Sequence, residues 1–393
     1  MERKMADFLF YVAWALFLLS SLLEHTILTI GENADMLLMC MKLVRYIAYG
    51  ICFIKIVNGR YHRKILLSGI MIGVIFILSY LGSGNRVMCL YLLVLFAAFG
   101  IDGRQSIKIS YRIQALVLGI FITLSLGGIV TDHIFEPDSR MRHGLGFNWA
   151  TTAPILYLYI ILGYIYIKRE NTTCIEYLIM ECVNIWLYKM TDTRMAFILS
   201  SLFLLFFALE GLFRNRWKYW RRLGMLYCGV PVLLSFFAFF LHWGYDAENE
   251  IWSKLNSLLS NRLYLGKNAI ATYGISLFGQ KIRWVGFSVR RDTVSGVTGY
   301  NYVDCSYIQM MLEYGVIFLA IVVGIYTIAV YRAVKEEDWY LVFALLIVLG
   351  FGITEPRLMN FAFNPFPLMA FCRLRQPEIE RRKEFYLCKS RNH

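Results

Sequence analysis

Residues 8–30 read FLFYVAWALFLLSSLLEHTILTI and carry no charged side chain before Glu24. A helix needs about 20 mostly apolar residues to cross the roughly 30 Å hydrocarbon layer of a membrane. This run is too long for the apolar region of a signal peptide, and no small-residue cleavage site follows it. We therefore interpret it as the first of several membrane-spanning helices.

Further apolar stretches follow, so we expect an all-α, polytopic membrane protein with about 10–12 membrane-spanning helices. The candidates are residues 8–30, 36–57, 65–81, 87–101, 113–131, 150–167, 173–188, 195–213, 223–242, 306–331, 339–353 and 358–372. The fourth, seventh, eleventh and twelfth are short or weak, and the seventh carries Glu176 and Glu181.

The composition excludes several other classes of protein. Hydrophobic residues make up 58% of the 393 residues and charged residues 17%, whereas a soluble chain has about 45–50% and about 25%. The nine cysteines form no CxxC pair and no Cys/His metal spacing. A soluble enzyme, a disulfide-rich secreted protein and a disordered chain are excluded, and we expect neither a metal site nor a cofactor.

The net charge of +13 indicates orientation rather than a nucleic-acid partner. Cytoplasmic loops of membrane proteins are enriched in Lys and Arg. Placing the N-terminus inside puts most basic residues of the short loops on the same side as the basic tail, 373–393. We therefore expect both termini in the cytoplasm and an even number of spans.

The candidate spans divide the chain into four parts. Residues 1–242 hold about nine spans, 243–305 form one large extracytoplasmic loop, 306–372 hold spans ten to twelve, and 373–393 form the cytoplasmic tail. A long ordered loop usually carries function, so residues 243–305 are the first place to look for a site.

This loop contains an amphipathic segment and a concentration of positive charge. Residues 251–264 space their apolar side chains as a short amphipathic helix does. Seven basic and no acidic residues lie between Lys254 and Arg291, among them Arg262 and Arg290. Such a stretch indicates an anionic partner, either lipid headgroups, a lipid pyrophosphate or an acidic glycan; a surface that merely faces headgroups is the alternative.

Two more outer arginines lie in the loop after the fifth candidate span. Arg140 and Arg142 are two residues apart and precede His143. The planar guanidinium group matches the geometry of phosphate. The structural alternative is that both arginines form ion pairs with Asp138 and Glu136.

Three basic residues lie within or at the start of apolar stretches. Arg194 opens the eighth candidate span, where it either binds an anion or simply extends to the headgroups. Lys42 and Arg45 are three residues apart in the second span and share one helical face. Because charges are costly in lipid, we expect that face to line the bundle interior or a wet cavity.

Polar residues at the outer ends of two late spans complete the candidate site. Asp304 lies where it would cap the tenth span, and with Tyr307 it would place polar groups at the mouth of a cavity. Glu355 follows the eleventh span on the same side. Acids at or near membrane depth are functional candidates by default.

Five segments together resemble the Wzy-type polysaccharide polymerases of capsule and O-antigen assembly, within the polymerase/O-antigen ligase superfamily. With the number of candidate spans and the large late outer loop, the resemblance covers nearly the whole chain. The segments are RHGLGF (142–147), DTRMAF (192–197), LNSLLSNRLYLGKNAIATYGISLFGQKI (255–282), YNYVDCSYIQMMLEYGVIF (300–318) and NPFPLM (364–369).

The resemblance implies an inverting, metal-independent glycosyltransferase in the bacterial cytoplasmic membrane. It implies polymerisation of undecaprenyl-diphosphate-linked oligosaccharide repeat units on the outer face, without a cofactor. The implied partners are the lipid-linked donor and acceptor, membrane lipids, a flippase and a chain-length regulator. Functional residues of the family map onto Arg142, Arg194, Arg262 and Asp304.

The sequence departs from the family pattern at three places. Asn148 is followed by Trp149 where the family often has an Asn-Pro or His-Pro pair. Cys305 replaces the usual asparagine after the aspartate, and Asn261 replaces the usual glycine before the loop arginine. These departures affect the roles of single residues more than the resemblance as a whole.

A mechanism follows from the residues and the resemblance together. Arginines would stabilise the charge that develops on a lipid diphosphate as it leaves. We expect Arg142, Arg194 and Arg262 to hold it, together with Arg290 and Arg291. The acceptor hydroxyl needs a base, for which the candidates, in order, are Asp304, Glu355 and His143.

Two other functions remain open from the sequence. An O-antigen ligase-like enzyme would share the chemistry and transfer to a different acceptor. A polysaccharide flippase would be expected to show two related halves. The chain shows no such internal repeat, and its one large outer loop favours chemistry at the outer face.

Overall fold

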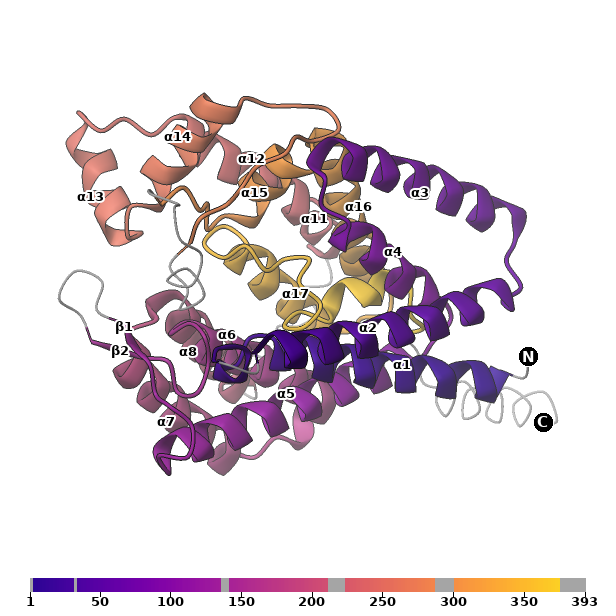
Figure 1. The fold of residues 1–393 in the computed structure, drawn as a ribbon, viewed down its shortest axis with the longest axis horizontal. Helices are drawn as coiled ribbons and strands as arrows, with labels where there is room; N and C mark the ends of the chain where they lie inside the picture. The colour runs from indigo at the N-terminus through magenta and orange to yellow at the C-terminus, as the bar shows by residue number, and fades with distance from the viewer. Residues whose placement is uncertain (1–2, 32–33, 136–140, 211–222, 287–299, 375–393) are drawn as a thin grey trace.

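The computed structural model describes residues 3–31, 34–135, 141–210, 223–286 and 300–374 (Figure 1). It is 71% helical with 2% strand, which confirms a mostly helical chain. The only strands in these residues form a short antiparallel hairpin in which Phe135 pairs with Arg142.

The elements are α1 (Arg3–Leu23), η1 (Ile27–Thr29), α2 (Ala34–Val57), α3 (Arg63–Ser83), α4 (Val87–Ala97), α5 (Gly103–Leu126), β1 (Ile134–Phe135), β2 (Arg142–His143), α6 (Thr152–Lys168), η3 (Arg169–Asn171), α7 (Cys174–Thr191), α8 (Arg194–Ala208), α11 (Gly224–Tyr227), α12 (Val230–Trp243), α13 (Glu250–Leu258), α14 (Arg262–Tyr273), α15 (Ser306–Glu313), α16 (Val316–Lys335), α17 (Trp339–Phe351) and η6 (Phe366–Ala370).

Five of the described helices are long and apolar enough to cross a membrane, judged by length and composition. They are α1, α2, α3, α5 and α16. Many apolar side chains of α2 and α3 are exposed, including Met39 and Met71. Large exposed apolar surfaces are rare on soluble proteins, so this surface suits contact with lipid.

Helix α5 begins ten residues before the apolar stretch predicted at 113–131. Asp102 caps it by accepting hydrogen bonds from the backbone N–H groups of Arg104 and Gln105. Its early turns bury polar side chains, among them Ser110 and Gln114, against other helices. Hydropathy alone misses this start because the buried face of α5 is partly polar.

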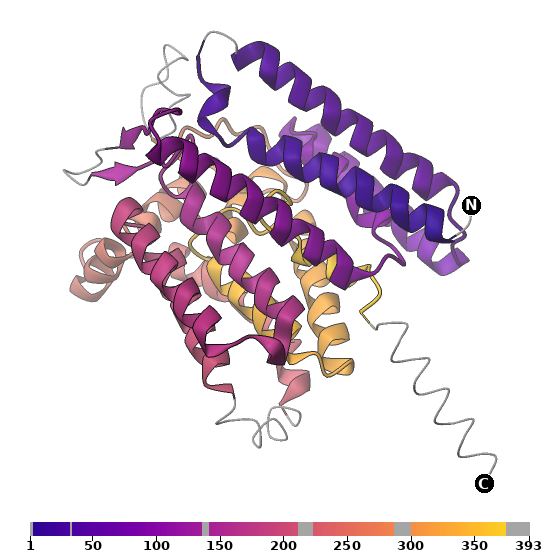
Figure 2. The same ribbon diagram turned by 90° about the horizontal axis from the view of Figure 1, so that it is seen from below.

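The bundle has two distinct ends. We call the end that carries α13, α14 and the β1–β2 hairpin the loop end, and the end where α1 begins the terminal end (Figures 1 and 2). Arg373 contacts Asp7 at the terminal end. The prediction of a tenth span at 306–331 is only partly right, because Tyr314 and Gly315 separate α15 from α16.

The twelfth candidate span, 358–372, is not a membrane-spanning α-helix. It consists of turns and the short 3-10 helix η6, and most of its residues are buried. Pro365 and Pro367 lack the N–H groups that an α-helix needs. The side chain of Asn364 instead accepts from the N–H of Phe366, which stabilises the turn. The apolar composition of this segment therefore reflects burial inside the bundle rather than a helix.

Side chains of neighbouring helices supply the hydrogen bonds that this segment cannot make itself. Irregular backbone at membrane depth is tolerated only where protein or a water-filled cavity surrounds it. Gln114 of α5 donates to Ala362 and Phe363, at 2.9 and 2.7 Å. Tyr326 of α16 donates to the carbonyl of Leu358 at 2.7 Å. Arg332 of α16 donates to the carbonyls of Met369, Ala370 and Cys372.

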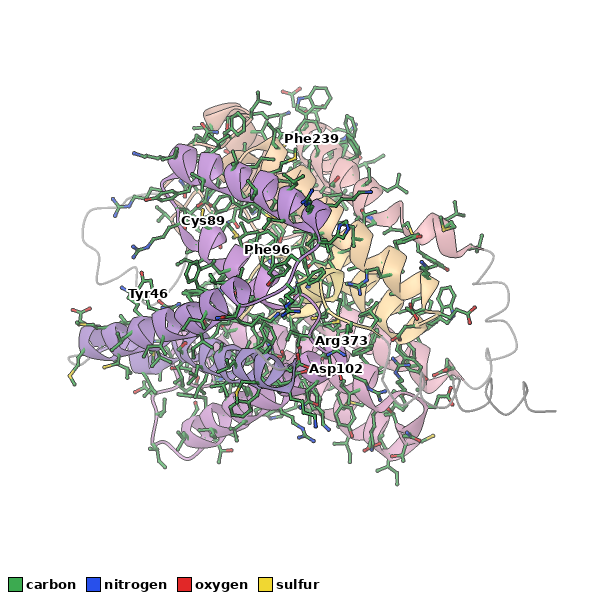
Figure 3. All side chains as sticks on the ribbon, turned by 90° about the vertical axis from the view of Figure 1, so that its right-hand side faces the viewer. Tyr46, Cys89, Phe96, Asp102, Phe239 and Arg373 are labelled. Atoms are coloured by element: carbon green, nitrogen blue, oxygen red, sulfur yellow. The ribbon has the colours of Figure 1, made fainter. Side chains whose placement is uncertain are left out.

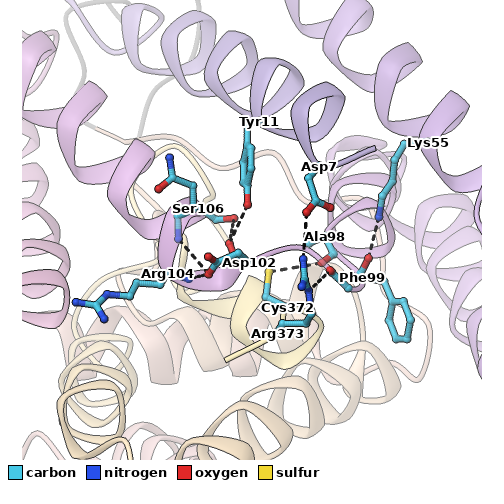
Figure 4. Close-up of polar contacts among 12 residues, drawn as sticks. Asp7, Tyr11, Lys55, Ala98, Phe99, Asp102, Arg104, Ser106, Cys372 and Arg373 are labelled. Carbon is cyan, nitrogen blue, oxygen red and sulfur yellow. Dashed lines mark hydrogen bonds and ion pairs between the residues drawn. The ribbon is translucent and has the colours of Figure 1, made fainter. Parts of the chain in front are cut away.

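The terminal end is tied together by two basic residues (Figure 4). Arg373 donates to the carbonyl of Gly100 and to the carboxylate of Asp7, at 2.5 and 3.1 Å. Its backbone bridges to Asp102, and Figure 3 shows these two residues side by side on this end of the molecule. Lys55 of α2 donates to the carbonyls of Ala97 and Phe99 at the end of α4.

Replacing Arg332 by alanine should strongly destabilise the protein. Three buried carbonyl groups would lose a charged donor, and hydrogen bonds to charged groups contribute about 1.5–3 kcal/mol each. We expect Arg332→Ala to lower the free energy of unfolding by at least about 2 kcal/mol, measured by denaturation in detergent micelles. Lys335→Ala, an exposed change in the same helical turn, should stay within about 0.5 kcal/mol; equal effects of the two changes would contradict this role.

Candidate functional site

The large loop folds into two short helices rather than one. Residues 251–264 were predicted as a single amphipathic helix, but α13 ends at Leu258 and α14 begins at Arg262. Between them Ser260 and Asn261 adopt left-handed backbone conformations with φ of 54° and 63°. Asparagine tolerates this conformation better than most residues. The turn gives Arg262 the first position of α14.

The stretch 276–280 is held in the break between α15 and α16. The N–H groups of Val316 and Ile317 donate to the carbonyls of Ser276 and Leu277. Gly315 and Gly279 have φ of +96° and +90°, and a Cβ on either would lie 2.3 Å from a backbone oxygen of the other segment. This close backbone contact anchors the loop against the bundle.

A buried acid fixes the other side of the same break. Glu313, the last residue of α15, accepts hydrogen bonds from Asn85 and from the indole of Trp284, each at 2.8 Å. These contacts join the turn between α3 and α4, the loop and α15. No sequence signal marks Glu313 for this role, because its partners Asn85 and Trp284 lie far away in the chain.

Four charged residues then meet at the loop end, and we call them the Arg–acid cluster: Arg262, Asp304, Glu355 and Arg357. Arg262 Nε lies 3.2 Å from Asp304 Oδ2, and its Nη2 lies 3.8 Å from Glu355 Oε1. Arg357 Nε lies 3.5 Å from Glu355 Oε2. The cluster therefore joins α14, the residues before α15 and the turn after α17.

Backbone contacts and ring stacking hold the two members of the cluster that follow α17. Ser306 Oγ donates to the carbonyl of Glu355 at 2.5 Å and accepts from the N–H of Leu358. The guanidinium of Arg357 lies 3.9 Å from the centre of the Phe363 ring. The irregular segment after α17 thus positions both charges.

Burial changes the acid–base properties of the cluster. Burial raises the pKa of Glu355 to about 7, although Arg357 and Arg262 oppose the shift. For Arg262, burial works against the charged form, but Asp304 and Glu355 outweigh it and raise the pKa. Arg262 therefore stays charged while Glu355 titrates near neutral pH.

The side chains of Arg142 and Arg194 lie at the turn between α7 and α8, also at the loop end. Arg142 donates to the carbonyl of Thr191 at 2.7 Å and to Thr193 Oγ1 at 3.2 Å. Arg194 begins α8, as predicted, and its half-exposed side chain lies 3.6 Å from Asp192. The side chains of both arginines therefore contact the turn between α7 and α8.

Contacts lead from the β1–β2 hairpin towards the Arg–acid cluster. His143 Nδ1 lies 2.5 Å from Asp132 Oδ2. After the hairpin, Phe147 forms a backbone bridge with Thr26, just beyond α1. The neighbouring His25 ring packs against Phe363, on which Arg357 stacks.

The structure corrects the predicted positions of Asp304 and Tyr307. Asp304 does not cap a helix with its side chain; Cys305 occupies that position, and Asp304 pairs with Arg262 instead. Tyr307 is not at a cavity mouth, because its side chain is buried and its hydroxyl donates to the carbonyl of Leu349.

The predicted inward orientation of the pair in the second span holds for Arg45 and not for Lys42. The inner face of α2 contains Met41 and Ala48, and Lys42 projects from the exposed side. Arg45 does turn inward, where it pairs with Glu24 at 2.5 Å. Three residues along a helix correspond to about 300°, so the two side chains point in directions about 60° apart. Arg140, Arg290 and Arg291 lie outside the described residues.

Arg357 is the charged member of the cluster that the sequence analysis missed as a site residue. The signal was present, since Glu355, Pro356 and Arg357 directly follow an apolar run on the expected outer side. Its importance depends on the contact with Glu355 and on the stacking on Phe363, which sequence spacing does not reveal.

No family model, no curated protein and no solved structure matches the chain. Within the described part of the chain, no group of three or more His, Cys, Asp or Glu side chains could hold a metal ion.

Gly315→Ala should detach the loop from the break between α15 and α16. The added Cβ would meet the carbonyl of Leu277 in a backbone conformation that alanine avoids, at a cost of about 1–3 kcal/mol or more. We expect a lower thermal unfolding midpoint in detergent. Gly324→Ala, in the same α16 helix with nothing within 4 Å of the new Cβ, should be neutral or stabilising. A neutral Gly315→Ala would show that the close contact is not needed.

Glu355 should make stability depend on pH. Its folded pKa of about 7 exceeds the ordinary value of 4.5, so the stability it contributes is full below pH 4.5 and is lost as pH rises to about 7. The shift corresponds to about 3 kcal/mol. Relative to wild type, Glu355→Gln should therefore gain stability by about that amount over this range, measured by denaturation at several pH values.

The exposed Glu250 of α13 provides the control for this experiment. Glu250→Gln should track wild type at every pH, because solvent surrounds its side chain. A constant difference between wild type and Glu355→Gln across the range would contradict the raised pKa.

Proposed function

We propose that this protein is a membrane glycosyltransferase that polymerises undecaprenyl-diphosphate-linked oligosaccharide units at the outer face of the bacterial cytoplasmic membrane. The observation that carries the proposal is the Arg–acid cluster, in which Arg262 and Arg357 flank a buried carboxyl group with a pKa of about 7. The apolar helices and the resemblance of the sequence to Wzy-type polymerases support the same assignment.

The two arginines of the cluster suit a leaving diphosphate. As the bond between the sugar and the diphosphate breaks, negative charge grows on the phosphate oxygens. Preorganised cationic donors in a site shielded from water stabilise such charge strongly. Arg262 is held from two sides by Asp304 and Glu355, so its guanidinium needs little reorganisation to meet the phosphate.

Glu355 is the better candidate for the base, which reverses the order given by the sequence. A base is most efficient when its pKa lies near the working pH, and that of Glu355 is about 7. Asp304 contacts Arg262 Nε directly, so its role is to position the arginine. His143, which is paired with Asp132 in the hairpin, ranks third.

The proposed transfer is a single displacement. The acceptor hydroxyl oxygen attacks the anomeric carbon, the bond from that carbon to the diphosphate oxygen breaks, and the proton of the hydroxyl passes to Glu355. The lipid diphosphate leaves with the bonding electron pair and is stabilised by Arg262 and Arg357. Arg142 and Arg194, at the turn between α7 and α8, contact the second lipid-linked unit.

Substitutions in the cluster should stop polymer formation. We expect Glu355→Gln and Arg262→Ala each to lower the rate at least 100-fold, because one removes the base and the other a charge-stabilising donor. The measurement is the length and yield of polymer made by the purified full-length protein from lipid-linked oligosaccharide. The wild-type rate should rise with pH around pH 7, and the residual rate of Glu355→Gln should lack this rise.

Lys254→Ala serves as the control, because Lys254 is exposed on α13 and pairs only with the exposed Glu250 among the described residues. It should make wild-type polymer. Full activity in both cluster variants would refute the assignment, and a single transfer to another acceptor instead of a ladder of lengths would identify a ligase.

A further inference from the structure

The turn between α3 and α4 reaches only part of the way along α2. The guanidinium of Arg86, just before α4, lies 5.8 Å from the centre of the Tyr46 ring, in the middle of α2. At the other end, Lys55 binds the last carbonyls of α4. At 1.5 Å per residue, α2 continues for about 18 Å from Tyr46 to its start at Ala34. The first part of α2 therefore extends beyond the α3–α4 turn. We call the region where α2 projects past this turn the step.

Four cationic residues lie on the three parts of the chain that meet at or next to this step. We call them the step cations: Lys42, Arg45, Arg86 and Lys281. Lys42 lies one turn from Tyr46 on the same face of α2, and Arg86 lies over the Tyr46 ring. Lys281 of the large loop packs against Gly84, two residues before Arg86.

The acids near the step do not balance these charges. Glu24 pairs with Arg45 at 2.5 Å. Glu313 is engaged by Asn85 and Trp284. Asp35 lies seven residues before Lys42, about 10 Å along the helix. Among the described residues, Lys42, Arg86 and Lys281 form no ion pair within 4.0 Å, so the step carries excess positive charge.

The step is bordered by exposed apolar side chains. Leu43 and Ile47 of α2 are 61% and 50% exposed, and α2 is one of the helices able to cross a membrane. Uncompensated charge at such a place is costly, and phosphate compensates arginine and lysine well. The combination suits a lipid whose phosphate headgroup meets the cations while its chain covers the apolar side chains.

Hydrogen bonds and a ring contact connect the step to the Arg–acid cluster. Asn85, the neighbour of Arg86, donates to Glu313 at 2.8 Å, and the indole of Trp284 donates to the same carboxylate. The Trp284 ring packs against Tyr302, with 6.2 Å between the ring centres, and Tyr302 lies two residues before Asp304. These contacts connect the α3–α4 turn to the residues that precede the cluster member Asp304.

We propose that the step cations form a second diphosphate site, where a polyprenyl diphosphate docks before its sugar reaches the Arg–acid cluster. The choice of a diphosphate lipid, rather than any phosphate lipid, rests on the proposed function. The site would hold the headgroup from the side of α2 that faces lipid, so the lipid need not leave the membrane.

The test measures binding without catalysis. Wild type and the Lys42→Ala/Arg86→Ala double variant, in nanodiscs of phosphatidylcholine, are titrated with a fluorescent polyprenyl diphosphate that carries no sugar. We expect at least tenfold weaker binding in the double variant. Arg45 is kept, since its removal would leave Glu24 without this ion pair. Arg63→Ala/Lys64→Ala, which removes two exposed cations at the other end of α3, is the matched control and should bind as wild type does.

Competition identifies the ligand. Unlabelled polyprenyl diphosphate should displace the probe, whereas phosphatidylglycerol and inorganic pyrophosphate at the same concentration should not. Equal displacement by phosphatidylglycerol would overturn the proposal in favour of a general anionic-lipid surface. Equal displacement by pyrophosphate would overturn it in favour of a site that needs no lipid chain.

The outcomes separate this inference from the proposed function. If the double variant binds normally while Glu355→Gln abolishes polymer formation, the step site is wrong and the glycosyltransferase assignment stands. If the double variant loses binding but wild type makes no polymer, the step site stands and the assignment fails.

Discussion

The buried, irregular segment after α17 is the constraint on which the rest of the structure depends. Its backbone runs through the bundle from Glu355 to Arg373 without a regular α-helix, so neighbouring helices must satisfy its carbonyl groups. Gln114 and Arg332 do so from α5 and α16. At one end the segment presents Glu355 and Arg357 to the loop, and at the other Arg373 ties the terminal end together. A change that lets it relax would therefore alter the site and the packing of the bundle together.

Much of the helical framework could be predicted because hydropathy and helix length are local properties. The predictions that are wrong concern positions whose structure depends on contacts between residues far apart in the sequence. Residues 358–372 are as apolar as a span, yet Pro365 and Pro367 together with donors on other helices make them irregular. The two prolines are the local sequence signal that argues against an α-helix here, because they lack the N–H groups that a helix needs.

The sequence predicts which residues belong to the candidate site better than it predicts which of these residues contact each other. Arg262 and Asp304 were both chosen, but 42 residues separate them and only the fold shows that they pair. Asp304 looked like a helix cap because it precedes a helix, a local signal that the longer-range ion pair overrides. Lys42 and Arg45 were assigned to one face by spacing, whereas the packing of α2 turns only Arg45 inward.

The charge balance of the cluster couples the two parts of the proposed reaction, proton transfer and departure of the diphosphate. With both acids ionised, two carboxylates face two guanidinium groups, and the cluster is close to neutral. When Glu355 accepts the proton of the attacking hydroxyl, its negative charge disappears. Arg262 and Arg357 then lose a competing partner at the moment when charge builds up on the diphosphate. Proton transfer and leaving-group stabilisation would thus reinforce each other, which requires an acid that can be protonated near neutral pH, as burial allows for Glu355.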